Sequence, residues 1–237
     1  MSVRAIKPFL ELCRISNLPT VWTNVIAAVV LSVPEARWSL IGILALSLSS
    51  FYMGGMCLND IYDREADRTG KPFRPLPSGR VPVRAAFYLT AMLFAAGLLL
   101  LLVIPYREAL WAGFVLFIVI VLYDKFHKTH PASIMLMAMS RAMVFVIAGI
   151  AAAGAVTVTA AIAGVVQFCY TLLISTIARV ENTRKERFPF PVIPAMIACI
   201  SLIDGALMAS FASPSWLLAG LAGALLTLAG QAYVRGD

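Results

Sequence analysis

Long apolar runs alternate with short polar connections along almost the whole chain. Each run is close to the ~20 apolar residues that a helix needs to cross a membrane. The eight runs are residues 18–33, 40–58, 84–104, 108–123, 132–153, 158–178, 190–211 and 214–234. We therefore predict an all-α, polytopic membrane bundle of about eight transmembrane helices. One unit is expected to cover residues 1–237, without an appended soluble domain.

The composition excludes a soluble globular protein. Of the 237 residues, 61% are hydrophobic and 13% are charged, and the mean hydropathy is +0.88. Soluble domains carry ~25% charged residues. The formal charge of +7 does not indicate a nucleic-acid partner, because the basic residues lie in short connections between apolar runs.

The basic residues are segregated between the two sides of the predicted bundle. Sixteen of the nineteen lie in the two termini and the connections on their side, and two, Arg37 and Arg107, lie on the other side. Connections rich in lysine and arginine stay cytoplasmic. We therefore predict a multi-pass protein of the cell inner membrane with both termini cytoplasmic.

The second apolar run leads directly into residues 59–67, which hold four of the twelve acidic residues. If the helix continues, Asp60, Asp63 and Asp67 fall within about 60° of arc, and Asn59 lies about 40° further round. Three carboxylates on one face repel one another unless a cation neutralises them. Carboxylate and amide oxygens on one side suit Mg²⁺, which keeps other positions for water and phosphate.

A proline-rich basic segment follows at residues 68–80. The prolines keep it non-helical, so we expect basic side chains to point back over the carboxylates. The alternative is a solvated helix end whose acids pair with Arg64, Arg68 and Lys71. Metal ligands beside basic groups, at the mouth of an apolar bundle, suit a lipid-tailed diphosphate whose tail lies among the helices.

At this point the chain resembles a known family. Residues 59–67 together with 74–80 resemble the first signature of the UbiA superfamily of intramembrane prenyltransferases. Residues 123–124, the segment around Arg141 and the acid-poor segment at 176–186 look closer to the small UbiA-like proteins of ebo-type gene clusters than to the quinone-pathway enzymes. The resemblance implies a bundle, usually of nine helices, around a central cavity open to the cytoplasmic side. It also implies Mg²⁺-dependent transfer of a prenyl group from a prenyl diphosphate to an aromatic or other lipid-soluble acceptor.

The family resemblance also implies roles for single residues of the first signature. Mg²⁺ and diphosphate are expected on Asn59, Asp60, Asp63 and Asp67, and the three aspartates are the catalytic candidates. The basic residues expected near the diphosphate are Lys71 and Arg74.

Two further regions carry candidate substrate contacts. Tyr123 and Lys128 match a tyrosine and a basic pair that the family has at the end of the fourth span, although a topology charge explains Lys128 equally well. His127 and His130 lack a third ligand and so make a poor zinc site. Arg141 lies inside the fifth run, where a charge is costly unless it faces a polar cavity. We expect it to face the diphosphate or an acidic partner.

The segment after the sixth run occupies the place of the family's second acidic signature, but it is poor in acids. Glu181 is the candidate metal ligand and catalytic residue there, and Asn182 a candidate substrate contact. Arg179 could replace a second metal as counter-charge to the diphosphate. This depletion supports an alternative, a catalytically reduced protein that binds prenyl lipid or acts as a scaffold. A transporter is disfavoured, because nearly all ionisable residues lie on one side.

Overall fold

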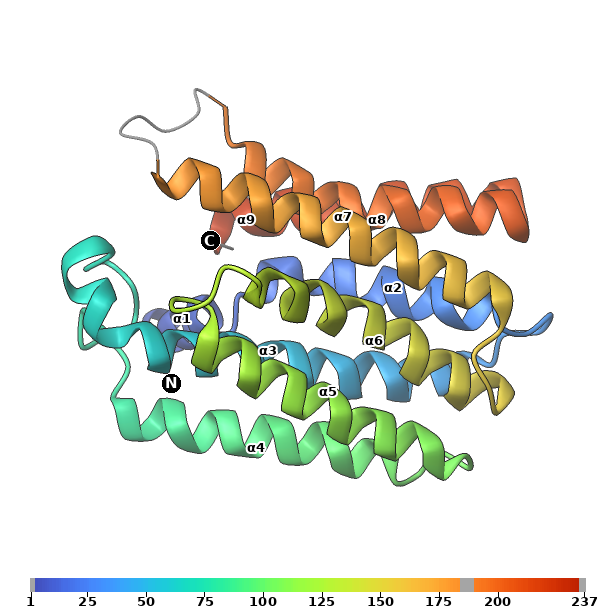
Figure 1. Ribbon diagram of the computed structural model, residues 1–237, viewed down its shortest axis with the longest axis horizontal. Coiled ribbons are helices and arrows are strands. Elements are labelled where there is room, and N and C mark those ends of the chain that lie inside the picture. Colours follow the sequence, from blue (N-terminus) through green and yellow to red (C-terminus); the bar gives the residue numbers. More distant parts are fainter. Residues whose placement is uncertain (1–2, 184–189, 235–237) are drawn as a thin grey trace.

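The computed structural model describes residues 3–183 and 190–234, and every regular element there is helical. The elements are α1 (Val3–Leu12), the 3₁₀ turn η1 (Ile15–Asn17), α2 (Leu18–Val30), α3 (Trp38–Gly70), α4 (Val83–Leu101), α5 (Arg107–Phe126), α6 (Ser133–Ala153), α7 (Val158–Thr183), α8 (Val192–Phe211), the 3₁₀ turn η2 (Pro214–Trp216) and α9 (Leu217–Tyr233). Each of the helices α2 to α9 overlaps one of the eight apolar runs. The predicted all-α membrane bundle is confirmed (Figure 1).

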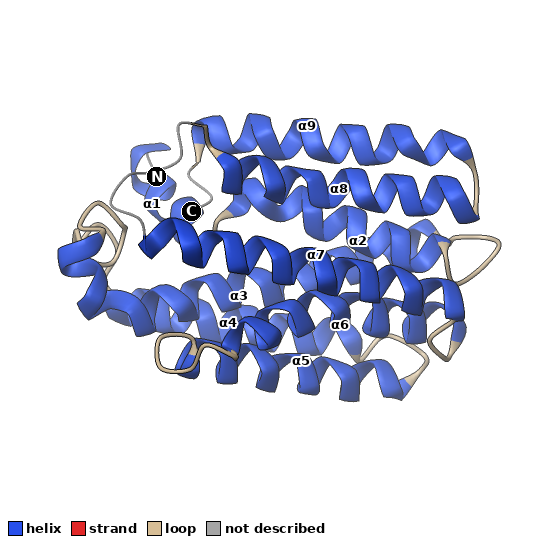
Figure 2. Ribbon diagram, turned by 45° about the horizontal axis from the view of Figure 1, so that its top comes forward, coloured by secondary structure: helices blue, strands red, loops and turns tan. Residues whose placement is uncertain are grey.

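The long helices run side by side, and the chain reverses direction between each helix and the next (Figures 1 and 2). The carboxyl ends of α3, α5 and α7 lie at the same end of the bundle as α1. The connections from α4 to α5, α6 to α7 and α8 to α9 lie at the opposite end. The charged connections therefore gather at one end of the molecule, as the distribution of basic residues predicts.

The number of helices of spanning length is close to the predicted eight, and α2 is the shorter one. Among the described residues, seven helices are long and apolar enough to cross a membrane. Helix α2 has 13 residues and reaches about 20 Å, less than the ~30 Å hydrocarbon core of a bilayer. It contacts α3, α6, α7, α8 and α9, and nine of its residues are buried. Because other helices surround α2, a short helix is sufficient there.

Helix α3 is much longer than the apolar run from which it was predicted. The run ends at residue 58, but the helix continues to Gly70 and has 33 residues, or about 50 Å. Its last turns therefore extend beyond a hydrocarbon core of ~30 Å. Because the helix continues past residue 67, Asp60, Asp63 and Asp67 share one helical face, as predicted.

Helices α8 and α9 approach each other closely through glycine. A Cβ placed on Gly220 would lie 2.8 Å from the Cα of Gly205 and 2.7 Å from the carbonyl oxygen of Ser201. Both neighbouring atoms belong to backbone, so neither can move without shifting a helix. Small residues let membrane helices pack by backbone contact, and Gly220 serves this purpose here.

Candidate active site

The polar end of α3 turns its acidic face into the protein. The four buried side chains on that face are Asn59, Asp60, Asp63 and Asp67. Glu65 and Arg68 lie on the exposed face of the same helix and pair with each other at 2.7 Å. The helical spacing therefore separates a solvated ion pair from a buried cluster. The alternative of a solvated helix end describes only the outer face.

Asp60 and Asp67 share one arginine from the proline-rich segment. Arg74 Nη1 lies 2.7 Å from Asp67 Oδ2 and 3.3 Å from Asp60 Oδ1, and Arg74 itself is buried. The expectation that this segment points a basic side chain back over the carboxylates is confirmed. Arg14, next to η1, adds a second cation, because its Nη2 lies 3.2 Å from Asp60 Oδ1.

Asp63 is held by cations from the connection between α5 and α6. His127 Nε2 lies 3.0 Å and Lys128 Nζ lies 2.5 Å from Asp63 Oδ1. The Asp63 carboxylate raises the pKa of His127 above its ordinary value because it stabilises the imidazolium. Arg14, Arg74 and Lys128, with His127 when it is protonated, thus face the carboxylates, so in this structure the chain itself supplies counter-charge to the acidic face.

Asn59 connects the acidic face to α5. Its Nδ2 donates a hydrogen bond to Asp124 Oδ1 at 3.1 Å, and Asp124 is only 2% exposed. The second oxygen of Asp124, Oδ2, has no hydrogen-bond partner among the described residues. A buried polar atom without a partner is costly. Asp124 Oδ2 can therefore accept a hydrogen bond from a ligand.

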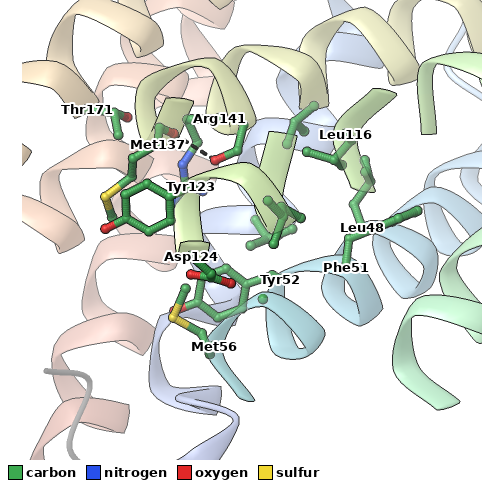
Figure 3. A pocket seen from close by; sticks show the side chains of 15 residues that line it. Leu48, Phe51, Tyr52, Met56, Leu116, Tyr123, Asp124, Met137, Arg141 and Thr171 are labelled. Carbon is green, nitrogen blue, oxygen red and sulfur yellow. Dashed lines mark hydrogen bonds between the residues drawn. The ribbon is translucent and has the colours of Figure 1, made fainter. Parts of the chain in front are cut away.

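An apolar pocket begins beside this cluster. It has a volume of about 100 Å³ and lies between α2, α3, α5, α6 and α7. Gly55 and Met56, one turn before Asn59 and Asp60 on α3, form part of its wall, and so does Asp124. Further lining side chains are Leu48, Phe51, Tyr52, Leu116, Tyr123, Arg141 and Thr171 (Figure 3). The pocket therefore extends into the bundle from Asp124, which Asn59 connects to the acidic face.

A second, polar pocket of about 200 Å³ lies on the other side of Asp60, toward α1. Three arginines line it, namely Arg14, Arg74 and Arg80. Arg80, whose side chain is partly exposed, is held by Glu11 at 2.7 Å. The acidic face thus lies between an arginine-lined pocket and an apolar pocket, an arrangement that suits a molecule with an anionic head and a hydrocarbon tail.

Arg141, a charge inside a membrane span, lines the apolar pocket. Its Nη1 donates to Asn24 Oδ1 at 2.8 Å and to Thr20 Oγ1 at 3.4 Å. The acidic partner is Asp204, which Asn24 connects to Arg141 by donating to Asp204 Oδ2 at 2.7 Å. Among the described residues, Arg141 forms no ion pair with the carboxylates of α3.

The remaining predicted residues lie around the mouth of the site. Lys71 ends α3, where its backbone N–H donates to the carbonyl oxygen of Asp67 at 2.9 Å. Arg179 donates to the carbonyl oxygen of Pro131 at 2.8 Å, so it approaches the connection between α5 and α6. Glu181 is half-buried in the last turns of α7. The side chain of Asn182 lies outside the described part of the chain.

Two residues of the cluster were not predicted as site residues. Arg14 belongs to the basic N-terminal arm that indicates topology, and its contact with Asp60 depends on a left-handed backbone (φ 46°, ψ 48°) after α1. The sequence around His127 indicates only a poor zinc site with His130. Arg14 is 46 residues from Asp60 in the sequence, and His127 is 64 residues from Asp63. Local sequence patterns carry no signal for contacts between residues so far apart.

The residues of the acidic face fit Mg²⁺ by their chemistry. Among the described histidine, cysteine, aspartate and glutamate side chains, no three converge as a ready metal site. Mg²⁺ at phosphate sites commonly takes one or two carboxylates and fills its other positions with water and phosphate oxygens. The buried oxygens of Asp60, Asp63 and Asp67 supply that kind of ligand.

The sequence matches a family of known proteins. The model of the UbiA prenyltransferase family matches residues 18–235. A digeranylgeranylglyceryl phosphate synthase from Sulfolobus acidocaldarius is 33% identical over 123 residues, which are 51% of this chain and 42% of that protein. The chain thus aligns with less than half the length of this relative.

Solved structures share the fold. One, from a study of digeranylgeranylglyceryl phosphate synthase in membranes, superposes with a TM-score of 0.64 at 23% identity and covers 97% of this chain and 88% of that one. A UbiA homologue from Archaeoglobus fulgidus, bound to GPP and Mg²⁺, has a TM-score of 0.58 at 16% identity and covers 95% and 97%. With seven apolar helices of spanning length among its described residues, the chain is an integral multi-pass membrane protein and belongs to the UbiA prenyltransferase family.

Proposed function

We propose that this protein is a Mg²⁺-dependent prenyltransferase that moves a prenyl group from a prenyl diphosphate to a lipid-soluble acceptor within the membrane. The observation that carries the proposal is the buried acidic face of α3, which lies between an arginine-lined pocket and an apolar pocket. The name of the relative from Sulfolobus acidocaldarius and the GPP and Mg²⁺ bound to the Archaeoglobus fulgidus homologue support the same class of donor.

The diphosphate group of the donor would bind at the acidic face. Asp60, Asp63 and Asp67, with Asn59, would hold Mg²⁺, which supplies charge stabilisation to the departing diphosphate. The cations that neutralise the carboxylates in this structure lie within reach of an incoming anion. In the proposal Arg14, Arg74, His127 and Lys128 shift part of their bonding to phosphate oxygens, with Lys71 beside them.

The hydrocarbon tail would occupy the apolar pocket. Leu48, Phe51 and Leu116 line its apolar side, and burial there excludes water from the carbon that reacts. Tyr123 lies at the polar end of the pocket, next to Asp124. We assign Tyr123 to the boundary between the diphosphate and the tail.

The segment at the end of α7 would complete the site from the other half of the bundle. In the proposal Glu181 and Asn182 approach the donor from this side, Glu181 as metal ligand and catalytic residue, and Arg179 supplies positive charge. Both termini would face the cytoplasm of an inner-membrane protein. The gathering of the charged connections at one end of the bundle supports that orientation.

The experiment that tests the proposal uses the purified full chain in nanodiscs with Mg²⁺, prenyl diphosphates of several lengths and a membrane lipid extract. Prenylated products are identified by mass. We expect product with the wild-type protein and a loss of at least ~10²-fold in Asp60→Asn, because a leaving-group contact of this kind contributes that much. Glu65→Gln is the matched control, since Glu65 lies on the exposed face of the same helix and should leave turnover unchanged.

A prenyl-lipid-binding or scaffold protein is the second candidate. It is favoured by the segment at residues 176–186, in which Glu181 and Glu186 are the two acidic residues of the sequence. In the same experiment this candidate predicts that GPP binds with Mg²⁺ but that no product forms with any lipid in the extract. Equal turnover in Asp60→Asn and the wild type would refute the proposed role of the acidic face.

A further inference from the structure

The apolar pocket has one polar side. Figure 3 shows Asp124, Arg141 and Thr171 on one side of the cavity and Leu48, Phe51 and Leu116 on the other. Asp124 Oδ2 and Thr171 Oγ1 are buried, and neither has a hydrogen-bond partner among the described residues. A wall with unused hydrogen-bonding atoms is costly against a hydrocarbon and favourable against a polar group. The pocket therefore suits a ligand with a polar end as well as an apolar body.

Arg141 is aimed at this pocket by contacts made from a single nitrogen. Both of its hydrogen bonds to described residues leave from Nη1, to Asn24 Oδ1 at 2.8 Å and to Thr20 Oγ1 at 3.4 Å. An arginine carries five N–H donors on three nitrogens. The donors of Nε and Nη2 are therefore available on a side chain that lines the pocket.

The anchor behind Arg141 is a buried carboxylate on α8. Asn24 accepts from Arg141 and donates to Asp204 Oδ2 at 2.7 Å, and Gln167 Nε2 donates to Asp204 Oδ1 at 2.8 Å. Asn24, Gln167 and Asp204 are all 0% exposed. Since the amide of Asn24 must present its oxygen to a cation and its nitrogen to an anion, only one orientation satisfies both neighbours. Asn24 and Asp204 therefore form a hydrogen-bonded relay that fixes the direction of Arg141.

The charges on the polar side favour one class of ligand. Arg141 can donate to a ligand oxygen, while the free oxygen of Asp124 can accept from a ligand O–H and repels an anion. A hydrocarbon would leave both groups, and Thr171, without partners. A neutral hydroxyl both accepts and donates, so it satisfies this wall better than a carboxylate or a methyl group.

We propose that the polar side of the pocket binds the acceptor substrate through a neutral hydroxyl group, that Arg141 selects for this group, and that Asn24 and Asp204 are positioning residues that hold Arg141 in place. This inference rests on the proposed prenyltransferase function, which provides the reason for an acceptor site beside the diphosphate site. It adds an acceptor contact and a relay spanning α2, α6 and α8.

The test measures binding of two probes of nearly equal shape, phenol and toluene, to the full chain in nanodiscs by saturation-transfer NMR. Partition into lipid is the same for all variants and cancels in the comparison. We expect the wild type to prefer phenol, and Arg141→Met to reduce that preference by about tenfold, the size of a lost hydrogen bond to a charged group. Asp204→Asn keeps the shape of the side chain and should reduce the preference several-fold.

Tyr170→Phe is the matched control. Tyr170 on α7 donates a hydrogen bond to the carbonyl oxygen of Met196 on α8 at 3.0 Å, so it joins α7 to α8 as Gln167 does. Among the described residues, no hydrogen bond joins it to Arg141, Asn24 or Asp204. Its phenol preference should equal that of the wild type. Equal loss in Tyr170→Phe and Asp204→Asn would reduce the relay to general helix packing and overturn the positioning role.

Binding of GPP with Mg²⁺ to each variant separates this inference from the proposed function. We expect Arg141→Met and Asp204→Asn to retain GPP binding and Asp60→Asn to lose it. Loss of GPP binding in Arg141→Met with the phenol preference intact would place Arg141 in the donor site and overturn the inference. An absent phenol preference in the wild type would also overturn it. Unchanged GPP binding in Asp60→Asn would instead count against the proposed function alone.

Discussion

Removal of Arg74 should destabilise the protein far more than removal of an arginine in an equally short ion pair on the surface. Arg74 lies 2.7 Å from Asp67, and Arg68 lies 2.7 Å from Glu65. The side chains of the first pair are 8% and 10% exposed, and those of the second 54% and 69%. The distance is the same, so the two pairs differ in burial and in the second carboxylate, Asp60, that Arg74 also contacts.

The magnitude follows from what each substitution leaves behind. Arg74→Met leaves Asp60 and Asp67 buried without their shared cation. Loss of one partner of a buried ion pair costs about 3–5 kcal/mol. Arg14 still contacts Asp60 at 3.2 Å, so we expect a value near the lower end, about 3 kcal/mol. Arg68→Met should cost at most ~1 kcal/mol, as exposed pairs do.

The assay is unfolding of the purified protein by sodium dodecyl sulfate, followed by the fluorescence of its four tryptophans in EDTA. A parallel titration with Mg²⁺ should restore more stability to Arg74→Met than to the wild type, because two carboxylates have lost a counter-charge there. Free energies of unfolding that agree within ~0.5 kcal/mol for Arg74→Met and Arg68→Met would refute the reasoning. The buried pair would then contribute no more than an exposed one.

Three further outcomes are expected. Gly220→Ala should destabilise the protein by about 1–3 kcal/mol, because the added Cβ meets the backbone of Gly205. Gly42→Ala is the control: its added Cβ has nothing within 4 Å, so the substitution should be neutral or stabilising by up to ~1 kcal/mol. Equal unfolding curves for the two variants would contradict this. The pKa of His127 is raised by Asp63, so this ion pair stabilises the fold below the ordinary histidine pKa of about 6.5 and is lost as the pH rises through the raised value. In EDTA, the stability difference between the wild type and His127→Asn should therefore shrink as the pH is raised above about 6.5, and a constant difference would exclude the charge effect. Removal of Mg²⁺ by EDTA should abolish product formation in the lipid-extract assay and Mg²⁺ should restore it, whereas turnover in EDTA would exclude metal dependence.

The acidic face could be predicted because its information is local. The helical period of 3.6 residues places Asp60, Asp63 and Asp67 together as soon as the helix continues past the apolar run. The position of Arg74 near the acidic face could also be predicted, since it lies only seven positions after Asp67 in the sequence. The structure bears out the shared face, and Arg74 is a basic side chain of the proline-rich segment that points back over it.

The length of α2 could not be predicted from hydropathy. Its residues belong to an apolar run of spanning length, but the helix stops at Val30 and lies among five other helices. An apolar run indicates that a segment is removed from water, and both the lipid bilayer and the interior of a helix bundle exclude water. Contacts with neighbouring helices decide between the two.

By itself, the sequence determined the class of protein, the helices, the side on which charge gathers, and the acidic face, because hydropathy and helical period act over a few residues. Only the tertiary structure decided which cations meet the carboxylates and what lies behind Arg141. Arg14 reaches Asp60 across 46 residues, and Asn24 reaches Asp204 across 180. Such pairs form because a buried charge is costly without a partner, and the packing of the helices determines which partner is near enough.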